Sequence, residues 1–146
     1  MAINDERTVA ILQSDRFPYR NSGDDPKESP PGRDLAVFLM HEMSTRGFAP
    51  TFATPIQGEG GWHWDGDLDN KSFNLFVHWA WIGNPPRDCW VIQPDLRKGV
   101  LRTMFGKPAR PDELAPICEL LHSVLDHNAV FSSVQWLTDE EFRKVY

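Results

Sequence analysis

The fold of this chain follows from one stretch of sequence, Gly61-Trp62-His63-Trp64-Asp65-Gly66, together with the longer stretch Phe73-Asn74-Leu75-Phe76-Val77-His78-Trp79-Ala80-Trp81-Ile82. Large apolar side chains occupy alternate positions in both stretches, which is the period of a β-strand with one buried face. A third apolar run follows at residues 88–93. Polar turn residues at 67–72 and 83–87 separate the three runs, so we expect an antiparallel meander of three strands.

The expected registers place the tryptophans on one face of this meander. Pairing Trp64 with Leu75 and Trp81 with Trp90 brings the large apolar side chains together. The predicted core face consists of Trp62, Trp64, Phe73, Leu75, Val77, Trp79, Trp81, Trp90 and Ile92. The opposite face carries His63, Asp65, Asn74, Phe76, His78, Ala80, Ile82, Cys89, Val91 and Gln93. This second face is polar at one end and apolar at the other, and a slip of one residue would exchange the faces of a strand.

Further elements are expected on both sides of the meander. They are strands at 8–12 and 130–137, a helix from Pro30 to Gly47 capped by Ser29, and a helix at 112–127. Thr138 with Glu141 three residues later is the signature of a capping box, which predicts a short closing helix. The order is β-α-β-β-β-α-β-α within a single domain, residues 1–146. It favours an α+β fold, an antiparallel sheet of four to five strands with two main helices packed on its tryptophan-rich face.

Composition restricts the class of protein further. The 146 residues are 40% hydrophobic and include six Trp, which is enough apolar material for a core. A net charge of −6 disfavours nucleic-acid binding, because that binding depends on cations that contact phosphate. No signal sequence or membrane-spanning run is visible, so we expect a cytoplasmic protein with Cys89 and Cys118 as reduced, partly buried thiols. Nothing in the sequence predicts the oligomeric state.

Sequence motifs for catalysis or cofactor binding are absent. There is no phosphate-binding GxxxxGK[ST], no dinucleotide GxGxxG, no GxSxG and no CxxC. His41-Glu42 opens like a zinc-protease helix, but Thr45 stands where the second histidine is required. The stretch 65–69 has the spacing of a calcium loop, yet its sixth and twelfth positions are Asn70 and Phe76 instead of Gly and Glu. We therefore expect no cofactor.

One candidate metal site lies on the second face of the predicted sheet. His63, Asp65 and His78 supply two imidazoles and a carboxylate on neighbouring strands, which can bind a divalent metal or transfer a proton. Structural roles are the alternative: His63 as a residue at a strand edge, and His78 as a hydrogen-bond partner of Gln93 across the sheet. Both interpretations remain open from the sequence.

Charge is distributed unevenly along the chain and indicates partner-binding surfaces. An acidic segment contains Glu59, Asp65, Asp67 and Asp69 without any Lys or Arg. A basic segment follows later, with Arg97, Lys98 and Arg102 interspersed among apolar residues. Cations around an apolar centre suit recognition of a protein partner. We therefore expect two opposed charged surfaces, one acidic and one basic.

A protein-binding module is the function that these observations favour, with inhibition of a partner by surface complementarity as its most concrete form. The small acidic α+β layout resembles that of bacterial immunity or inhibitor proteins, a likeness that transfers no residues. One alternative is a small metal-dependent enzyme or metal-binding protein that uses His63, Asp65 and His78. Another is a small-molecule sensor with a pocket between the sheet and the loop at 15–29.

Overall fold

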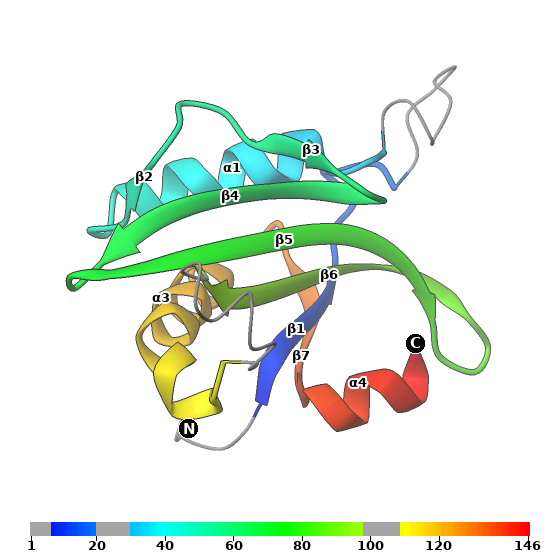
Figure 1. Ribbon diagram of the computed structural model, residues 1–146. Coiled ribbons are helices and arrows are strands. Elements are labelled where there is room, and N and C mark those ends of the chain that lie inside the picture. The colour runs from blue at the N-terminus through cyan, green and yellow to red at the C-terminus, as the bar shows by residue number, and fades with distance from the viewer. Residues whose placement is uncertain (1–6, 20–29, 98–108) are drawn as a thin grey trace.

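A computed structural model of the chain describes residues 7–19, 30–97 and 109–146, and these form an antiparallel sheet with three helices and one 3-10 turn (Figure 1). The strands are β1 (Arg7–Gln13), β2 (Ala49–Pro50), β3 (Ile56–Gly58), β4 (Gly61–Leu68), β5 (Lys71–Ile82), β6 (Arg87–Leu96) and β7 (Ser132–Thr138). The helical elements are α1 (Arg33–Ser44), the 3-10 turn η1 (Pro111–Leu114), α3 (Ala115–Asp126) and α4 (Asp139–Val145). Within this part of the chain, no helix is long and apolar enough to cross a membrane.

The α+β class and the antiparallel meander are confirmed, but the counts of elements differ from the prediction. The sheet has seven strands in the described residues, in the order β2-β4-β5-β6-β1-β7, with β3 also paired to β4. The unforeseen strands β2 and β3 are two and three residues long, too short to show an alternating pattern. The capping box that was expected before the closing helix is present, because Glu141 N–H donates to Thr138 Oγ1 at 3.0 Å and the Glu141 carboxylate accepts from Thr138 N–H.

The main core lies on the tryptophan-rich face, under α1 and α3. Its fully buried members include Trp64, Phe73, Leu75, Trp90 and Ile92 from the sheet. Other members come from α1 and α3: Leu35, Leu39, Met43, Ile117, Leu121 and Val124. Burial of this many large apolar side chains is the dominant favourable contribution to folding.

The register of the first hairpin is confirmed, and that of the second is corrected. Trp64 faces Leu75 as predicted, but Trp90 faces Trp79 instead of Trp81, and Trp81 faces Asp88. A shift of two residues keeps every side chain on its predicted face. It moves Trp81 toward the end of the hairpin, where its side chain is 64% exposed. Trp81 is therefore not a core residue, and Trp79 is only partly buried.

Local backbone geometry explains where these elements begin and end. The β4–β5 hairpin turns at Asp69 and Asn70, whose positive φ angles of 51° and 65° are those of a two-residue type I′ turn. Both strands are therefore longer than expected, since the turn was predicted to span 67–72. Helix α1 begins after Gly32, later than expected, and the predicted cap Ser29 lies outside the described residues. Gly47 has a φ of 98°, and Phe48 N–H donates to Met43 O as a Schellman ending requires.

A second, smaller core lies on the opposite face of the sheet. It joins residues of the central strands to Phe142 of α4, namely Val9, Ile11, Ala80, Ile82, Cys89, Val91 and Leu137. Figure 1 shows α4 directly after β7, away from α1 and β4. Because α4 is one short helix, it covers only part of this face, and the side chains of β4 and of the first half of β5 are left half-exposed there.

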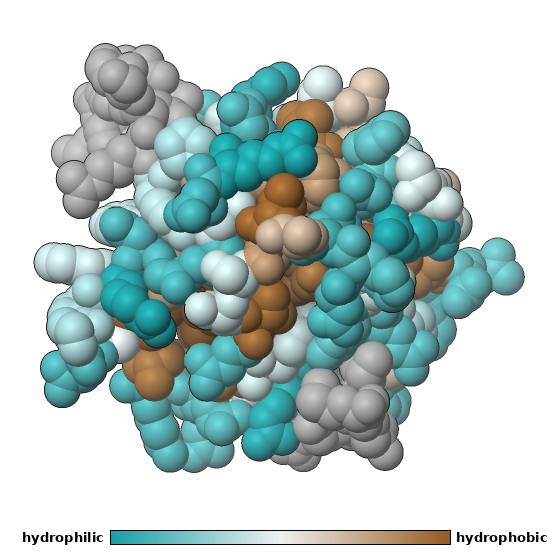
Figure 2. All heavy atoms as spheres, turned by 180° about the vertical axis from the view of Figure 1, so that it is seen from behind, coloured by the Kyte–Doolittle hydropathy of each residue, from teal (hydrophilic) through white to brown (hydrophobic). Residues whose placement is uncertain are grey.

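Some apolar surface also reaches solvent. Seen from behind, hydrophobic residues form a strip across the middle of the molecule with polar residues on both sides (Figure 2). Within the main core, Phe17 and Phe131 pack with the partly buried Phe38, with ring centroids 5.4–6.2 Å apart. The guanidinium of Arg16 lies 5.1 Å from the Phe38 ring centre, so a cation covers part of this aromatic cluster.

Candidate functional site

The structure brings together two of the three predicted metal ligands. The amide of Asn74 donates to Asp65 Oδ1 at 2.7 Å and lies 3.4 Å from His63 Nδ1, so one amide joins both side chains. Phe76 faces His63 in the register of β4 and β5. The ring of Phe76 in turn contacts the ring of His78, with centroids 5.2 Å apart.

His78 has the structural role that was considered as the alternative. It is 7% exposed, and its Nε2 lies 3.0 Å from Gln93 Oε1. Burial lowers the pKa of His78 below its ordinary value of 6.5, and the hydrogen bond to Gln93 offsets this only in part. The rings of Phe142 and Tyr146 from the α4 end of the chain contact it edge-on. His78 therefore belongs to the contact between the sheet and α4.

No group of three or more His, Cys, Asp or Glu side chains in the described ranges is placed to hold a metal ion. The structure thus does not gather His63, Asp65 and His78 around one point. The two cysteines are free and buried. Burial raises the pKa of the Cys89 thiol and raises that of Cys118 to about 12, which keeps both thiols protonated and weakly nucleophilic at neutral pH.

The predicted acidic segment does not form one patch. Glu59 precedes β4 and Asp69 follows it, and an eight-residue strand places these ends on the order of 25 Å apart. Asp67 is exposed and accepts a hydrogen bond from Ser72 Oγ at 2.6 Å. Asp65 is largely covered, with 18% of its side chain exposed.

The predicted basic segment meets the acidic one. Arg97 Nε lies 3.9 Å from Asp65 Oδ2, and the Arg97 backbone N–H donates to Ser72 O at 3.0 Å. The two segments are therefore in contact at this pair and do not form separate, opposed surfaces there. Lys98 and Arg102 lie outside the described residues.

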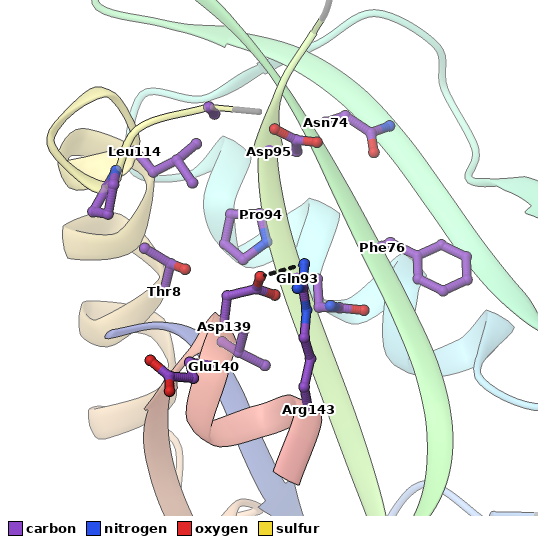
Figure 3. A pocket seen from close by; sticks show the side chains of 13 residues that line it. Thr8, Asn74, Phe76, Gln93, Pro94, Asp95, Leu114, Asp139, Glu140 and Arg143 are labelled. Atoms are coloured by element: carbon purple, nitrogen blue, oxygen red, sulfur yellow. Dashed lines mark ion pairs between the residues drawn. The ribbon is translucent and has the colours of Figure 1, made fainter. Parts of the chain in front are cut away.

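A groove of about 630 Å³ in the described part lies beside the polar half of the second face of the sheet, and its lining also includes Pro94 and Leu114 from the main-core side (Figure 3). It lies beside the start of β5 and the end of β6. The first turn of α4 and the start of η1 complete its lining. The residues that line the groove are Thr8, Val9, Asn74, Phe76, Gln93, Pro94, Asp95, Ala109, Pro111, Leu114, Asp139, Glu140 and Arg143. The lining thus combines polar and apolar side chains.

A smaller hollow of about 310 Å³ extends the groove toward β4. Asn74 and Asp95 line both spaces, and the smaller one adds Asp65, Leu96 and Arg97. The two hollows are therefore neighbours beside the open part of the sheet. We call the two together the sheet groove.

Of the three carboxylates that line the larger hollow, Asp139 and Glu140 form ion pairs with described residues. Arg143 Nη2 contacts Asp139 Oδ2 at 2.8 Å, as the dashed line in Figure 3 marks, and Lys144 Nζ lies 3.5 Å from Glu140 Oε1. Asp95 Oδ1 accepts the backbone N–H of Leu96 at 2.8 Å. No cation in the described ranges pairs with Asp95.

Sequence reasoning missed most of these residues. Asn74 and Gln93 were assigned to the correct face, and continuing the same alternation by two residues would have added Asp95. The contributions of Asp139, Glu140 and Arg143 had no such signal, because α4 reaches the groove through tertiary packing. The pocket expected between the sheet and the loop at 15–29 stays a prediction, because residues 20–29 of that loop lie outside the described residues. In its described start Phe17 is buried, and Tyr19 stacks on Trp90 with ring centroids 5.2 Å apart.

Comparison of the chain with protein families, with curated proteins and with solved structures found no match.

Proposed function

We propose that this chain is a protein-binding module, of the inhibitor or immunity type, that docks a partner on the sheet groove. The observation that carries the proposal is the unequal coverage of the second sheet face. Next to α4 this face is a closed apolar core, whereas over β4, β5 and β6 it is an open depression lined by polar side chains. An open face of this kind offers both apolar contact and hydrogen-bonding groups to a partner.

The polar groups of the groove are held in place before any partner arrives. The Asn74 amide is fixed by Asp65, and the Gln93 side chain is fixed by His78. Both residues lie on paired strands, so their backbone is rigid as well. Preorganised groups lose little conformational entropy on binding, which supports affinity.

The chemistry of the lining favours recognition. It consists of carboxylates, amides, a threonine hydroxyl and two guanidiniums together with apolar residues. The described lining includes no Ser, Cys, His or Lys, and two of its carboxylates, Asp139 and Glu140, are held in ion pairs. Inhibition would follow by occlusion, because the groove covers the functional surface of the partner that docks there.

The test compares two matched threonine substitutions. Thr8→Trp fills the groove wall at a half-buried strand position, whereas Thr54→Trp adds the same side chain at an exposed position in the loop between β2 and β3. A partner is captured from a native extract with the parental protein, identified, and purified. Calorimetry should then give similar affinities for the parental protein and Thr54→Trp, and at least tenfold weaker binding for Thr8→Trp.

Unfolding curves measured on both variants separate loss of binding from loss of fold. Equal binding by Thr8→Trp and Thr54→Trp would place the docking surface elsewhere. Failure of the parental protein to retain any partner would contradict the proposal itself.

A further inference from the structure

We infer that the sheet groove receives a basic segment of the partner protein, and that a Lys or Arg side chain of this segment pairs with Asp95. The inference rests on the proposed function and adds the chemistry of the partner. Its basis is the position of Asp95, the charge of the groove lining and the apolar residues among that lining.

Asp95 lies where the two hollows of the sheet groove meet, since it lines both. The guanidinium groups at either side are already engaged, Arg143 with Asp139 at 2.8 Å and Arg97 with Asp65 at 3.9 Å. One oxygen of Asp95 accepts the Leu96 N–H, which leaves the other oxygen for a ligand. Figure 3 shows Asp95 and Asn74 together at one end of the groove, away from α4.

Partial burial increases what a cation gains at this position. Asp95 is half-buried, so water screens its charge less than it screens a fully exposed carboxylate. No cation in the described ranges pairs with Asp95, whose described hydrogen bond is the one it accepts from the Leu96 N–H. A partner cation therefore adds a charge-assisted hydrogen bond.

The described lining as a whole is negative. Asp95, Asp139 and Glu140 line the larger hollow. Arg143 pairs with Asp139 and Lys144 pairs with Glu140, so among the described residues the carboxylate left without a cation is Asp95. This negative charge attracts a basic protein segment and repels the phosphates of a nucleic acid. The chain as a whole carries a net charge of −6, which also accelerates association with a basic partner.

The apolar part of the lining fits the aliphatic part of a basic side chain. Pro94, Leu114 and Val9 are buried residues that line the groove. Lys and Arg bury their methylene stems along apolar surface while the charged group stays near polar partners. The volume of about 630 Å³ exceeds what one side chain needs, so an extended segment is the expected occupant.

The experiment uses hexalysine as the probe and a matched pair of charge-removing variants. Asp95→Asn keeps an oxygen that can accept the Leu96 N–H, and Asp69→Asn places a favoured residue at the positive-φ turn position of the exposed hairpin. NMR follows the side-chain amides of Asn74 and Gln93 during titration. The parental protein and Asp69→Asn should show saturable shifts, Asp95→Asn at least fivefold weaker binding, and hexaglutamate no shifts.

Three outcomes overturn the inference. Hexalysine could leave the two amides unshifted, or Asp95→Asn could bind it as tightly as Asp69→Asn does. Spermine could bind the groove more tightly than hexalysine, which would identify a free polyamine as the ligand. The proposed function is judged separately. If Thr8→Trp abolishes binding of the captured partner but Asp95→Asn does not, the sheet groove is the docking surface, but its occupant does not pair with Asp95 and the inference is wrong.

Discussion

On one face of the sheet, apolar side chains continue across the strands beneath α1 and α3, whereas on the other face they stop where α4 ends. The change occurs within β5, between the half-buried Phe76 and the buried His78. Both faces are made by the same strands, so strand alternation alone does not decide which side chains are buried. The position of the covering helices decides it, and the uncovered part of the second face becomes the sheet groove.

The largest expected effect tests the closed face. Trp90 is fully buried, its indole donates to Phe17 O at 3.4 Å and its ring stacks on Tyr19, so Trp90→Ala should lower the free energy of unfolding by roughly 3–5 kcal/mol. Trp81 lies on the same face beyond the helices, and Trp81→Ala should change it by less than about 0.5 kcal/mol. Urea unfolding of both variants measures the difference. Similar losses would contradict the corrected register of the second hairpin.

How far the sequence predicts this fold is visible in the same two tryptophans. Alternation assigned both to the correct face, because that assignment depends only on the two-residue period. It did not identify the partner of Trp90, since registers that differ by two residues leave the pattern unchanged. The exposure of Trp81 depends on where α1 and α3 end over the sheet, which is tertiary information.

The candidate site shows the same limit. Asn74 and Gln93 could be placed on one face, and the pairing of His78 with Gln93 was one of the two interpretations considered. The carboxylates of α4 and the surroundings of Asp95 depend on contacts between distant segments. The predicted acidic segment was close in sequence but is spread along a strand, because an extended chain separates residues that a helix would bring together.

An intermediate effect is expected at the start of α4, which separates the closed part of the second face from the open one. Thr138→Ala removes the side-chain cap to Glu141 N–H and should cost about 1 kcal/mol. Thr45→Ala at the exposed end of α1 is the matched control and should cost less. Unfolding free energies measure both, and hydrogen exchange of α4 amides should accelerate only in Thr138→Ala. Unchanged exchange there would show that the cap does not hold α4 in place.

The smallest effect concerns the pH dependence of the contact between α4 and the sheet. His78 is buried among the rings of Phe76, Phe142 and Tyr146, and desolvation lowers its pKa in the folded state. The unfolded chain, with the ordinary pKa of 6.5, then binds more protons than the folded chain does. Stability should therefore fall as the pH decreases below about 6.5 and should be fully present above it.

Urea unfolding at pH 7.5 and pH 5.5 measures this loss, and the variants His78→Gln and His41→Gln assign it. His41 is exposed on α1, so His41→Gln should lose stability over this interval as the parental protein does. His78→Gln has no imidazole to protonate, and its unfolding free energy should change less between the two pH values. If His78→Gln keeps the parental dependence, protonation of His78 does not weaken the contact with α4, and the closed part of the second face is insensitive to pH in this range.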